Sequence, residues 1–451
     1  MAKRNYEIDM VHGSLLPKIL QFAFPMMLSG ILQLLFNAAD IIVVGRFSGK
    51  IALAAVGSTS ALTSLMITVF VGLSIGTNVL VAKYVGAREI KNIRDSVHTS
   101  IMMSLVCGVI LIFVGFFLSE PILRLMGTPD DVLKEATIYM KIYFASMPGV
   151  MLYNFGSAVL RAIGDTKRPL YYLTFAGIIN VICNLFFVIV FKWGVEGVAT
   201  ATAISQMISG ILVFICLLRS DGIYKVELKK LKINPKIMLE IIKIGLPAGL
   251  QGAIFSISNV LIQSSVNSFG SVGIAGSAAA GNIEGFIWIS MDAFYQADLC
   301  FTSQNIGAKK YSRINPIAIW NSIVVAILGT ILGVLSTVFA DELIGIYNSD
   351  LDVIAFGARR LMFIALPSAI GGIMDVIAGS VRGLGYSIMP TIVSLTGACG
   401  LRVIWVFTVF AMNPTPDVLF FSYPATWAIT TLCHLICLII IRKKFPKHDL
   451  A

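Results

Sequence analysis

The sequence predicts an all-α integral membrane protein made of two copies of one helical unit. Hydrophobic residues make up 57% of the 451 positions and charged residues only 13%, whereas soluble domains carry about 25% charged residues. Turn-type residues also recur 221 or 222 positions along the chain, as Pro25 and Pro247 do, and as Gly86-Ala87-Arg88 and Gly307-Ala308-Lys309 do. Matches of this residue type do not arise from a shared apolar bias. The pattern therefore indicates an internal duplication.

Twelve apolar runs approach or exceed the roughly 20 residues that cross a bilayer as a helix. They lie at about 15–46, 52–76, 97–118, 138–160, 169–191, 196–218, 238–268, 276–302, 315–340, 358–381, 390–411 and 419–441. The first run is too long for a cleavable signal peptide. The sequence therefore predicts twelve transmembrane helices, six in each copy.

The charged residues predict how these helices are oriented. Lys and Arg collect in alternate connections, for example Lys83 and Arg88, whereas the intervening connections carry acids such as Asp130 and Asp350. By the positive-inside rule both termini lie in the cytoplasm, and the protein is a multi-pass protein of the cell (inner or plasma) membrane. Orientation alone explains the net charge of +10, so no nucleic-acid partner is expected.

Three regions follow from these patterns. Residues 1–218 form a first lobe with helices one to six, residues 219–236 a cytoplasmic linker, and residues 237–451 a second lobe with helices seven to twelve. Six helices in each copy make the copies parallel, related by an axis along the membrane normal. Two such bundles are expected to enclose a cleft, and duplicated halves of this kind are typical of transporters that alternate access.

Asp40 is the strongest local signal, because it is an acid deep within the first span. Such a residue costs about 2.5–3.5 kcal/mol on insertion scales and is functional by default. Asn180 and Asn184 share one face of the fifth span, and Thr202 lies in the sixth. At about 1.5 Å per residue, Asp40, Asn184 and Thr202 lie at one level of the outer half of the membrane. Their oxygens can bind a proton or a small hard cation, or the residues can form a hydrogen-bond network that only joins helices.

The duplication favours function over a structural network. In the second copy Asp40 corresponds to Ile262, Asn180 to Leu401 and Asn184 to Trp405. A structural device would be expected in both copies.

The second half has a polar set of its own: Asp292, Asp298, Asp375 and Arg402. Arg402 lies near mid-span, so we expect it to pair with Asp292 or Asp375, either to hold the bundle together or as part of a coupling site. Four further side chains can line an apolar binding cavity or pack in the core, namely Glu284, Trp288, Met291 and Tyr295.

These features together resemble the multidrug and toxic compound extrusion (MATE) family of secondary transporters. The resemblance covers nearly the whole chain and depends on Pro25 with Asp40, Gly86-Ala87-Arg88, LRAIGDTKRP at 160–169, Asn180 with Asn184, and VRGLGYSIMP at 381–390. It implies a V-shaped arrangement of twelve helices in two bundles, and drug efflux driven by inward H⁺ or Na⁺ flux.

The resemblance also implies an amino-terminal cation site made by Asp40, Asn180, Asn184 and Thr202. Relatives have an acid or Asn at the position of Asn184. Because this chain has Asn there, Asp40 is the only carboxylate of the implied site. One branch of the family carries two acids in the second lobe, where this chain has Phe255 and Gly371. That second site is therefore not expected here.

We therefore expect an antiporter that exports amphiphilic, often cationic compounds in exchange for H⁺ or Na⁺, with protonation of Asp40 as the coupling event and Pro25 as the point where helix one bends. It is expected to work as a monomer in membrane lipid, without a cofactor or bound metal, since its seven cysteines form no ligand motif. The alternatives are a flippase for a lipid-linked saccharide and a membrane-embedded enzyme. Three of the four histidines lie at or outside span ends, which argues against the enzyme.

Overall fold

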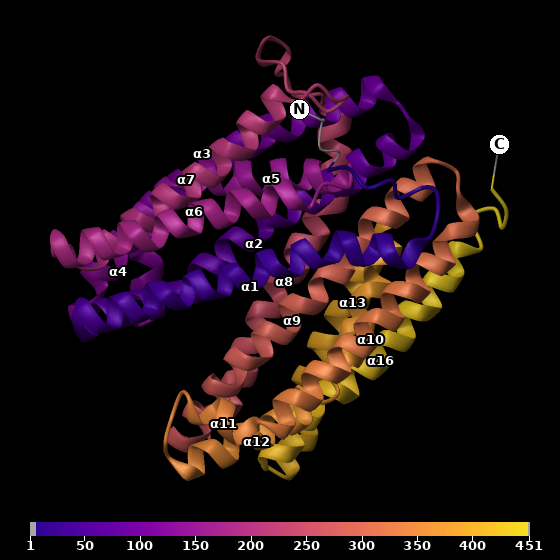
Figure 1. The fold of residues 1–451 in the computed structure, drawn as a ribbon. Helices are drawn as coiled ribbons and strands as arrows, with labels where there is room; N and C mark the ends of the chain where they lie inside the picture. Colours follow the sequence, from indigo (N-terminus) through magenta and orange to yellow (C-terminus); the bar gives the residue numbers. More distant parts are fainter. Residues whose placement is uncertain (1–5, 450–451) are drawn as a thin grey trace. The chain divides into compact units, whose positions relative to one another are not determined.

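The computed structural model describes residues 6–449, apart from the side chains of Lys50, Ser60 and Ala61. The two chain ends predicted to be cytoplasmic, residues 1–5 and 450–451, lie outside this range. The described residues form helices and connecting turns without β-strands (Figure 1). The predicted all-α class is confirmed.

The first half contains seven α-helices and one π-helix. They are α1 Leu15–Phe47, α2 Gly49–Ala87, α3 Ile90–Leu125, α4 Asp130–Ala145, α5 Met147–Ala162, α6 Lys167–Leu185, the π-helix η1 Phe186–Val190, and α7 Val195–Arg219.

The second half repeats this order after a short 3₁₀ turn. Its elements are η2 Leu228–Lys230, α8 Pro235–Asn267, α9 Gly270–Gly307, η3 Tyr311–Arg313, α10 Ile314–Val338, α11 Ala340–Gly345, α12 Leu351–Ile364, α13 Ser368–Gly383, α14 Ile388–Ser394, η4 Leu395–Leu401, α15 Arg402–Trp405, η5 Val406–Phe410 and α16 Pro416–Arg442.

Ten helices of the described chain are long and apolar enough to cross a membrane, and α12 with α13, bent by 44°, makes an eleventh span. The remaining predicted span, 138–160, falls on α4 and α5, which have 16 residues each and meet at Ser146. The break between α12 and α13 contains Pro367, which lies 221 positions after Ser146. Both copies therefore interrupt their fourth span at the same place.

Backbone conformation explains why the turn residues recur. Arg88 and Lys309 both have φ of 56°, and Gly164 and Gly385 have φ of 90° and 92°. This left-handed conformation ends a helix by satisfying its last carbonyl groups, and glycine adopts it without a steric penalty. The repeat thus conserves helix ends.

The chain divides into two compact units. Unit 1 comprises Leu28–Leu250 and the described residues up to Ile8, and unit 2 comprises Asp9–Met27 and the described residues from Gln251 onward. The first part of α1 therefore belongs to unit 2, the first part of α8 belongs to unit 1, and the predicted linker 219–236 lies within unit 1. Both crossings lie close after a proline inside the helix, Pro25 in α1 and Pro247 in α8.

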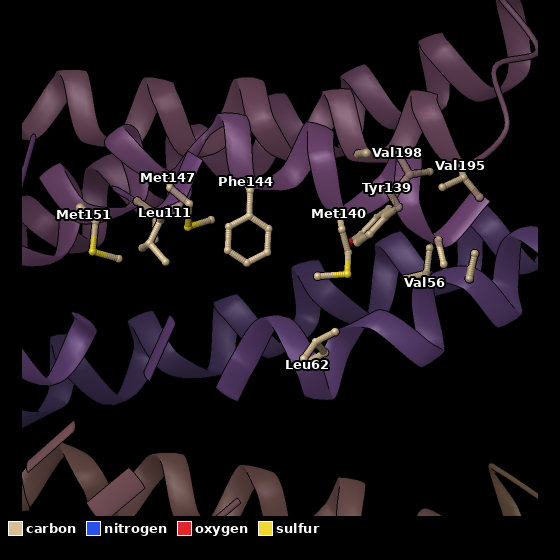
Figure 2. Packing of buried hydrophobic residues seen from close by; sticks show 14 of the residues in the cluster. Val56, Leu62, Leu111, Tyr139, Met140, Phe144, Met147, Met151, Val195 and Val198 are labelled. Atoms are coloured by element: carbon tan, nitrogen blue, oxygen red, sulfur yellow. The ribbon is translucent and has the colours of Figure 1, made fainter. Parts of the chain in front are cut away.

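Each unit has its own packed core, and equivalent helices are neighbours in the two. In unit 1, α5 packs against α2, α3 and α7, and in unit 2, α13 packs against α9, α10 and α16. Figure 2 shows part of the unit 1 core, where Phe144 lies among Leu111, Met140 and Met147. A Cβ atom added at Gly115 on α3 would lie 2.1 Å from the Cβ atom of Phe144 on α4, so α3 and α4 approach closely.

Candidate functional site

The structure brings together the four polar residues predicted for the first half. Thr202 Oγ1 on α7 donates to Asp40 Oδ2 on α1 at 3.2 Å, and Asn184 Nδ2 on α6 donates to Asp40 Oδ1. Asn184 also donates to Asn180 Oδ1 at 3.2 Å, and Asn180 Nδ2 donates to Thr202 Oγ1 at 3.4 Å. All four are buried, with Asp40 9% exposed. They form a closed ring of hydrogen bonds around a single carboxyl group.

Local structure explains why these side chains meet. Asn180 and Asn184 are one helical turn apart on α6, and the π-helix η1 begins two residues after Asn184. Gly177, one turn before Asn180, contacts Phe36 of α1 so closely that a Cβ atom there would lie 1.9 Å from the ring. This contact holds α6 against α1, and Asp40 lies one turn beyond Phe36.

A cavity of about 40 Å³ adjoins the carboxyl group and is lined in part by Gln33, Asn37, Asp40, Asn180 and Thr202. This volume admits water or a small cation, but not a drug-sized molecule. The Oδ1 atom of Asn184 is buried without a hydrogen-bond partner in the described structure. The site therefore offers carboxylate, amide and hydroxyl oxygens, the ligands that protons and hard cations use.

Unit 2 contains a larger cavity of about 530 Å³. Aromatic, polar and charged side chains line it, among them Phe255, Glu284, Trp288, Arg360, Asp375, Arg402, Tyr423 and Trp427. Two of the four residues predicted to line a cavity, Glu284 and Trp288, are here. The others are packed beside it, because Met291 lies against Gly372 and the Tyr295 hydroxyl accepts a hydrogen bond from Arg382 at 2.8 Å.

Arg402 does not form the expected ion pair. Within residues 6–449 its partners are Thr426 Oγ1, at 3.3 Å from Nη2, and the rings of Tyr423 and Trp427, whose centroids are 3.9 and 6.0 Å from the guanidinium carbon. The prediction of an Asp292 or Asp375 partner is wrong, because the faces of aromatic rings stabilise the positive charge of the guanidinium group. A search for opposite charges in the sequence does not reveal such contacts.

The ion pair of this cavity is Arg360 with Glu284, which the sequence reasoning missed. Arg360 Nε and Nη2 donate to the two oxygens of Glu284 at 2.8 and 2.9 Å, and both residues are buried. The sequence did contain a sign of this ion pair. Arg360 lies at the outer end of the tenth predicted span, on the side of the membrane where basic residues are scarce.

The three aspartates of the second half lie in different surroundings. Asp298 is fully buried and accepts hydrogen bonds from Asn321 and from Ser380, at 3.3 and 2.5 Å. The bond between Asp298 and Asn321 has a counterpart in unit 1. The residues 221 positions earlier, Thr77 and Ser100, are hydrogen-bonded to each other at 3.0 Å. Asp375 lines the cavity, and Asp292 is exposed. Of the four residues predicted as one polar network, Asp298 bonds to Asn321 and Ser380, whereas Arg402 bonds to Thr426.

Comparison with known proteins identifies the family of the chain. A sequence profile of the MatE family matches residues 25–186 and again 247–408. The probable multidrug resistance proteins YpnP and YoeA of Bacillus subtilis (strain 168) are 30% and 27% identical to this chain. The YpnP match covers 87% of this chain and 88% of YpnP, and the YoeA match covers 91% and 90%.

A solved structure of an outward-facing multidrug resistance MATE family transporter of the MOP superfamily superposes with a TM-score of 0.90. It covers 98% of this chain and 100% of that chain at 19% identity, a likeness that concerns the fold. The profile accounts for both halves of the chain, and the fold is that of twelve helices in two bundles. The chain therefore belongs to the MatE family, the multidrug and toxic compound extrusion proteins, which are multi-pass membrane transporters of small molecules and not enzymes.

Proposed function

We propose that this protein is a secondary active antiporter that exports amphiphilic, often cationic compounds, and that protonation of Asp40 couples export to an inward proton flux. The observation that carries the proposal is the ring of hydrogen bonds around Asp40, beside a cavity too small for the exported compound. A site of this size and chemistry suits the coupling ion. The larger cavity of unit 2 has the volume for a substrate.

Two opposing effects make Asp40 suitable as a switch. Burial disfavours the charged form of a carboxyl group, whereas hydrogen bonds donated to it favour that form. Here the donors are Thr202 and Asn184. If α1 and α7 move apart, the hydrogen bond from Thr202 to Asp40 weakens, and the charged form of Asp40 loses stabilisation. Protonation of Asp40 and the position of α1 therefore depend on each other.

Pro25 supplies a place for that movement. It lies inside α1, where proline removes a backbone hydrogen bond, and α1 passes from unit 2 to unit 1 after Met27. We infer that binding of an outside proton shifts the part of α1 that carries Asp40 and favours release of the substrate. In alternating access, the binding sites open first to one side of the membrane and then to the other.

Sodium is the second candidate ion, because amide and hydroxyl oxygens of the site can coordinate it. A single carboxylate gives the site little charge for a metal ion, so we favour the proton. A flippase is less favoured, because the relatives described above are named as multidrug resistance proteins. We place the protein in the cell membrane as a monomer, with cytoplasmic termini and without a cofactor.

Transport in proteoliposomes tests the proposal. Purified protein is reconstituted, and uptake of ethidium, a cationic amphiphile, is measured with a pH gradient at equal sodium and then with a sodium gradient at equal pH. We expect the pH gradient alone to drive accumulation above that of protein-free liposomes. Accumulation with sodium alone would replace the proton as coupling ion, and no accumulation with either gradient would overturn the antiporter proposal.

A further inference from the structure

We propose that the unit 2 cavity binds amphiphilic aromatic substrates that carry one carboxylate, and that Arg402 is the counter-ion for this group. The inference rests on the proposed export function and specifies its substrate class, as monoanions or zwitterions in addition to cations. It follows from the contacts of Arg402, which include no carboxylate in the described chain.

Arg402 is a buried cation that no carboxylate contacts in the described chain. The residue is 3% exposed, and its Nε atom has no hydrogen-bond partner there. Its known contacts are Thr426, the face of Tyr423 and, at 6.0 Å, the ring of Trp427. Guanidinium groups prefer bidentate pairing with a carboxylate, and an unpaired buried charge is costly. A bound carboxylate would supply the missing partner.

The other charges of the cavity do not supply it. Arg360 and Glu284 neutralise each other through two hydrogen bonds. Arg360 lines the same cavity as Arg402. Asp375 lines the cavity without bonding to Arg402. Its carboxyl group would repel a second anionic group and attract a cationic one, which favours monoanions and zwitterions over dianions.

The repeat shows that this cavity occupies the position of the Asp40 cavity in the other copy. Asn37, Asp40 and Thr202 line the small cavity, and their counterparts Asn259, Ile262 and Tyr423 line the large one. The acid of the first copy is thus replaced by an apolar residue, and the hydroxyl by an aromatic ring. That ring stacks on Arg402. One framework therefore holds an acidic site of about 40 Å³ in unit 1 and an aromatic site of about 530 Å³ that contains Arg402 in unit 2.

The backbone before Arg402 is specialised as well. The π-helix η4 ends at Leu401, immediately before Arg402, and covers 395–401. The equivalent residues of unit 1, 174–180, are ordinary α-helix within α6. π-Helical turns are frequent at functional sites because they change the direction of the following side chains. The rings of Trp288, Trp427 and Phe255 in the lining provide the apolar contact that an aromatic substrate needs.

Binding to the purified protein in neutral-lipid nanodiscs tests this inference without any ion gradient. Isothermal titration calorimetry is carried out with 1-pyrenebutyrate and with its neutral amide, 1-pyrenebutanamide, and heats from empty nanodiscs are subtracted. The two probes share the aromatic group and differ in charge. We expect the carboxylate to bind at least tenfold more tightly than the amide.

Two variants locate the effect. Arg402→Gln should reduce the affinity for the carboxylate to that for the amide and leave the amide unchanged. Arg359→Gln is the matched control, because Arg359 on α12 pairs with Asp417 outside the cavity lining. Its affinities should equal those of the wild type, and the melting temperature of each variant shows whether it is folded.

Equal affinity of the wild type for both probes would overturn the inference, even if Arg402→Gln does not fold. Carboxylate selectivity that persists in folded Arg402→Gln would overturn it as well. Failure of the antiporter proposal is seen separately, as absence of ethidium transport. Selective binding in a protein that does not transport would support the site and reject the proposed function.

Discussion

At the level of single residues, the balance of each buried charge determines what the residue can do. Glu284 and Arg360 are matched by two hydrogen bonds. Asp40 accepts hydrogen bonds from two neutral groups, the Asn184 amide and the Thr202 hydroxyl. Arg402 donates a hydrogen bond to the Thr426 hydroxyl and lies over the ring of Tyr423. The matched pair suits a structural role, whereas the other two charges can respond to a proton or a ligand.

Removing one partner of the matched pair should destabilise unit 2. Arg360→Met leaves Glu284 buried without its cation, at a cost of about 3–5 kcal/mol in the free energy of unfolding. The double variant Arg360→Met with Glu284→Leu should recover most of this loss, because an apolar pair replaces the ion pair. Thermal unfolding in detergent, followed by tryptophan fluorescence, measures both. A single variant as stable as the wild type would show that the pair is not structural.

The same contrast explains what could be predicted at this scale. The spacing of Asn180 and Asn184 on one helical face and the common depth of Asp40 and Thr202 were enough to predict their proximity, which the structure shows. The surroundings of Arg402 were not predictable, because cation–π contacts depend on ring orientation and not on charge pairing. Arg360 was missed because it lies near a predicted span end, where a charged residue needs no explanation.

At the level of helices, small residues determine how closely neighbours approach. α2 packs against the first part of α8, and a Cβ atom at Gly76 would lie 2.2 Å from the carbonyl oxygen of Ile241. A Cβ atom at Gly57, on the same helix, would have no heavy atom within 4 Å. The two glycines are chemically identical and differ in their surroundings.

Gly76→Ala should therefore lower the melting temperature, because the added methyl group forces α2 and α8 apart. Gly57→Ala should leave it unchanged or raise it slightly, since alanine favours a helix by about 1 kcal/mol over glycine. Differential scanning fluorimetry of both variants provides the comparison. Equal melting temperatures for Gly76→Ala and the wild type would mean that this contact does not limit packing.

Hydropathy predicted most spans within a few residues, including α1, α7 and α16. It did not predict the break at Ser146 or the π-helices, because these follow from local backbone geometry within a continuous apolar run. It also did not predict that α1 and α8 change units after Pro25 and Pro247. The apolar pattern marks where a helix crosses the membrane, but not which helices it contacts.

At the level of the whole molecule, the alternation of charge predicts orientation. Asp130 is the first residue of α4 and Asp350 is the N-cap of α12, both on connections poor in Lys and Arg. Lys229 lies in the basic stretch between the two halves. In a variant without native cysteines, Asp130→Cys and Asp350→Cys should react with a membrane-impermeant maleimide added to intact cells. Lys229→Cys, the matched control, should react only after the cells are opened. The reverse pattern would invert the topology.

The central claim, that Asp40 couples ion flux to export, is tested most directly by Asp40→Asn in the ethidium assay. The amide fills the same space and can keep the hydrogen-bonded ring, but it cannot take up or release a proton. We expect a normal melting temperature and complete loss of uptake driven by the pH gradient, while Asn180→Ala reduces uptake only in part. Asp298→Asn, the control at a buried acid outside both cavities, should transport normally. Gradient-driven uptake by Asp40→Asn at the wild-type rate would contradict the claim and assign coupling to Asp292, Asp298 or Asp375.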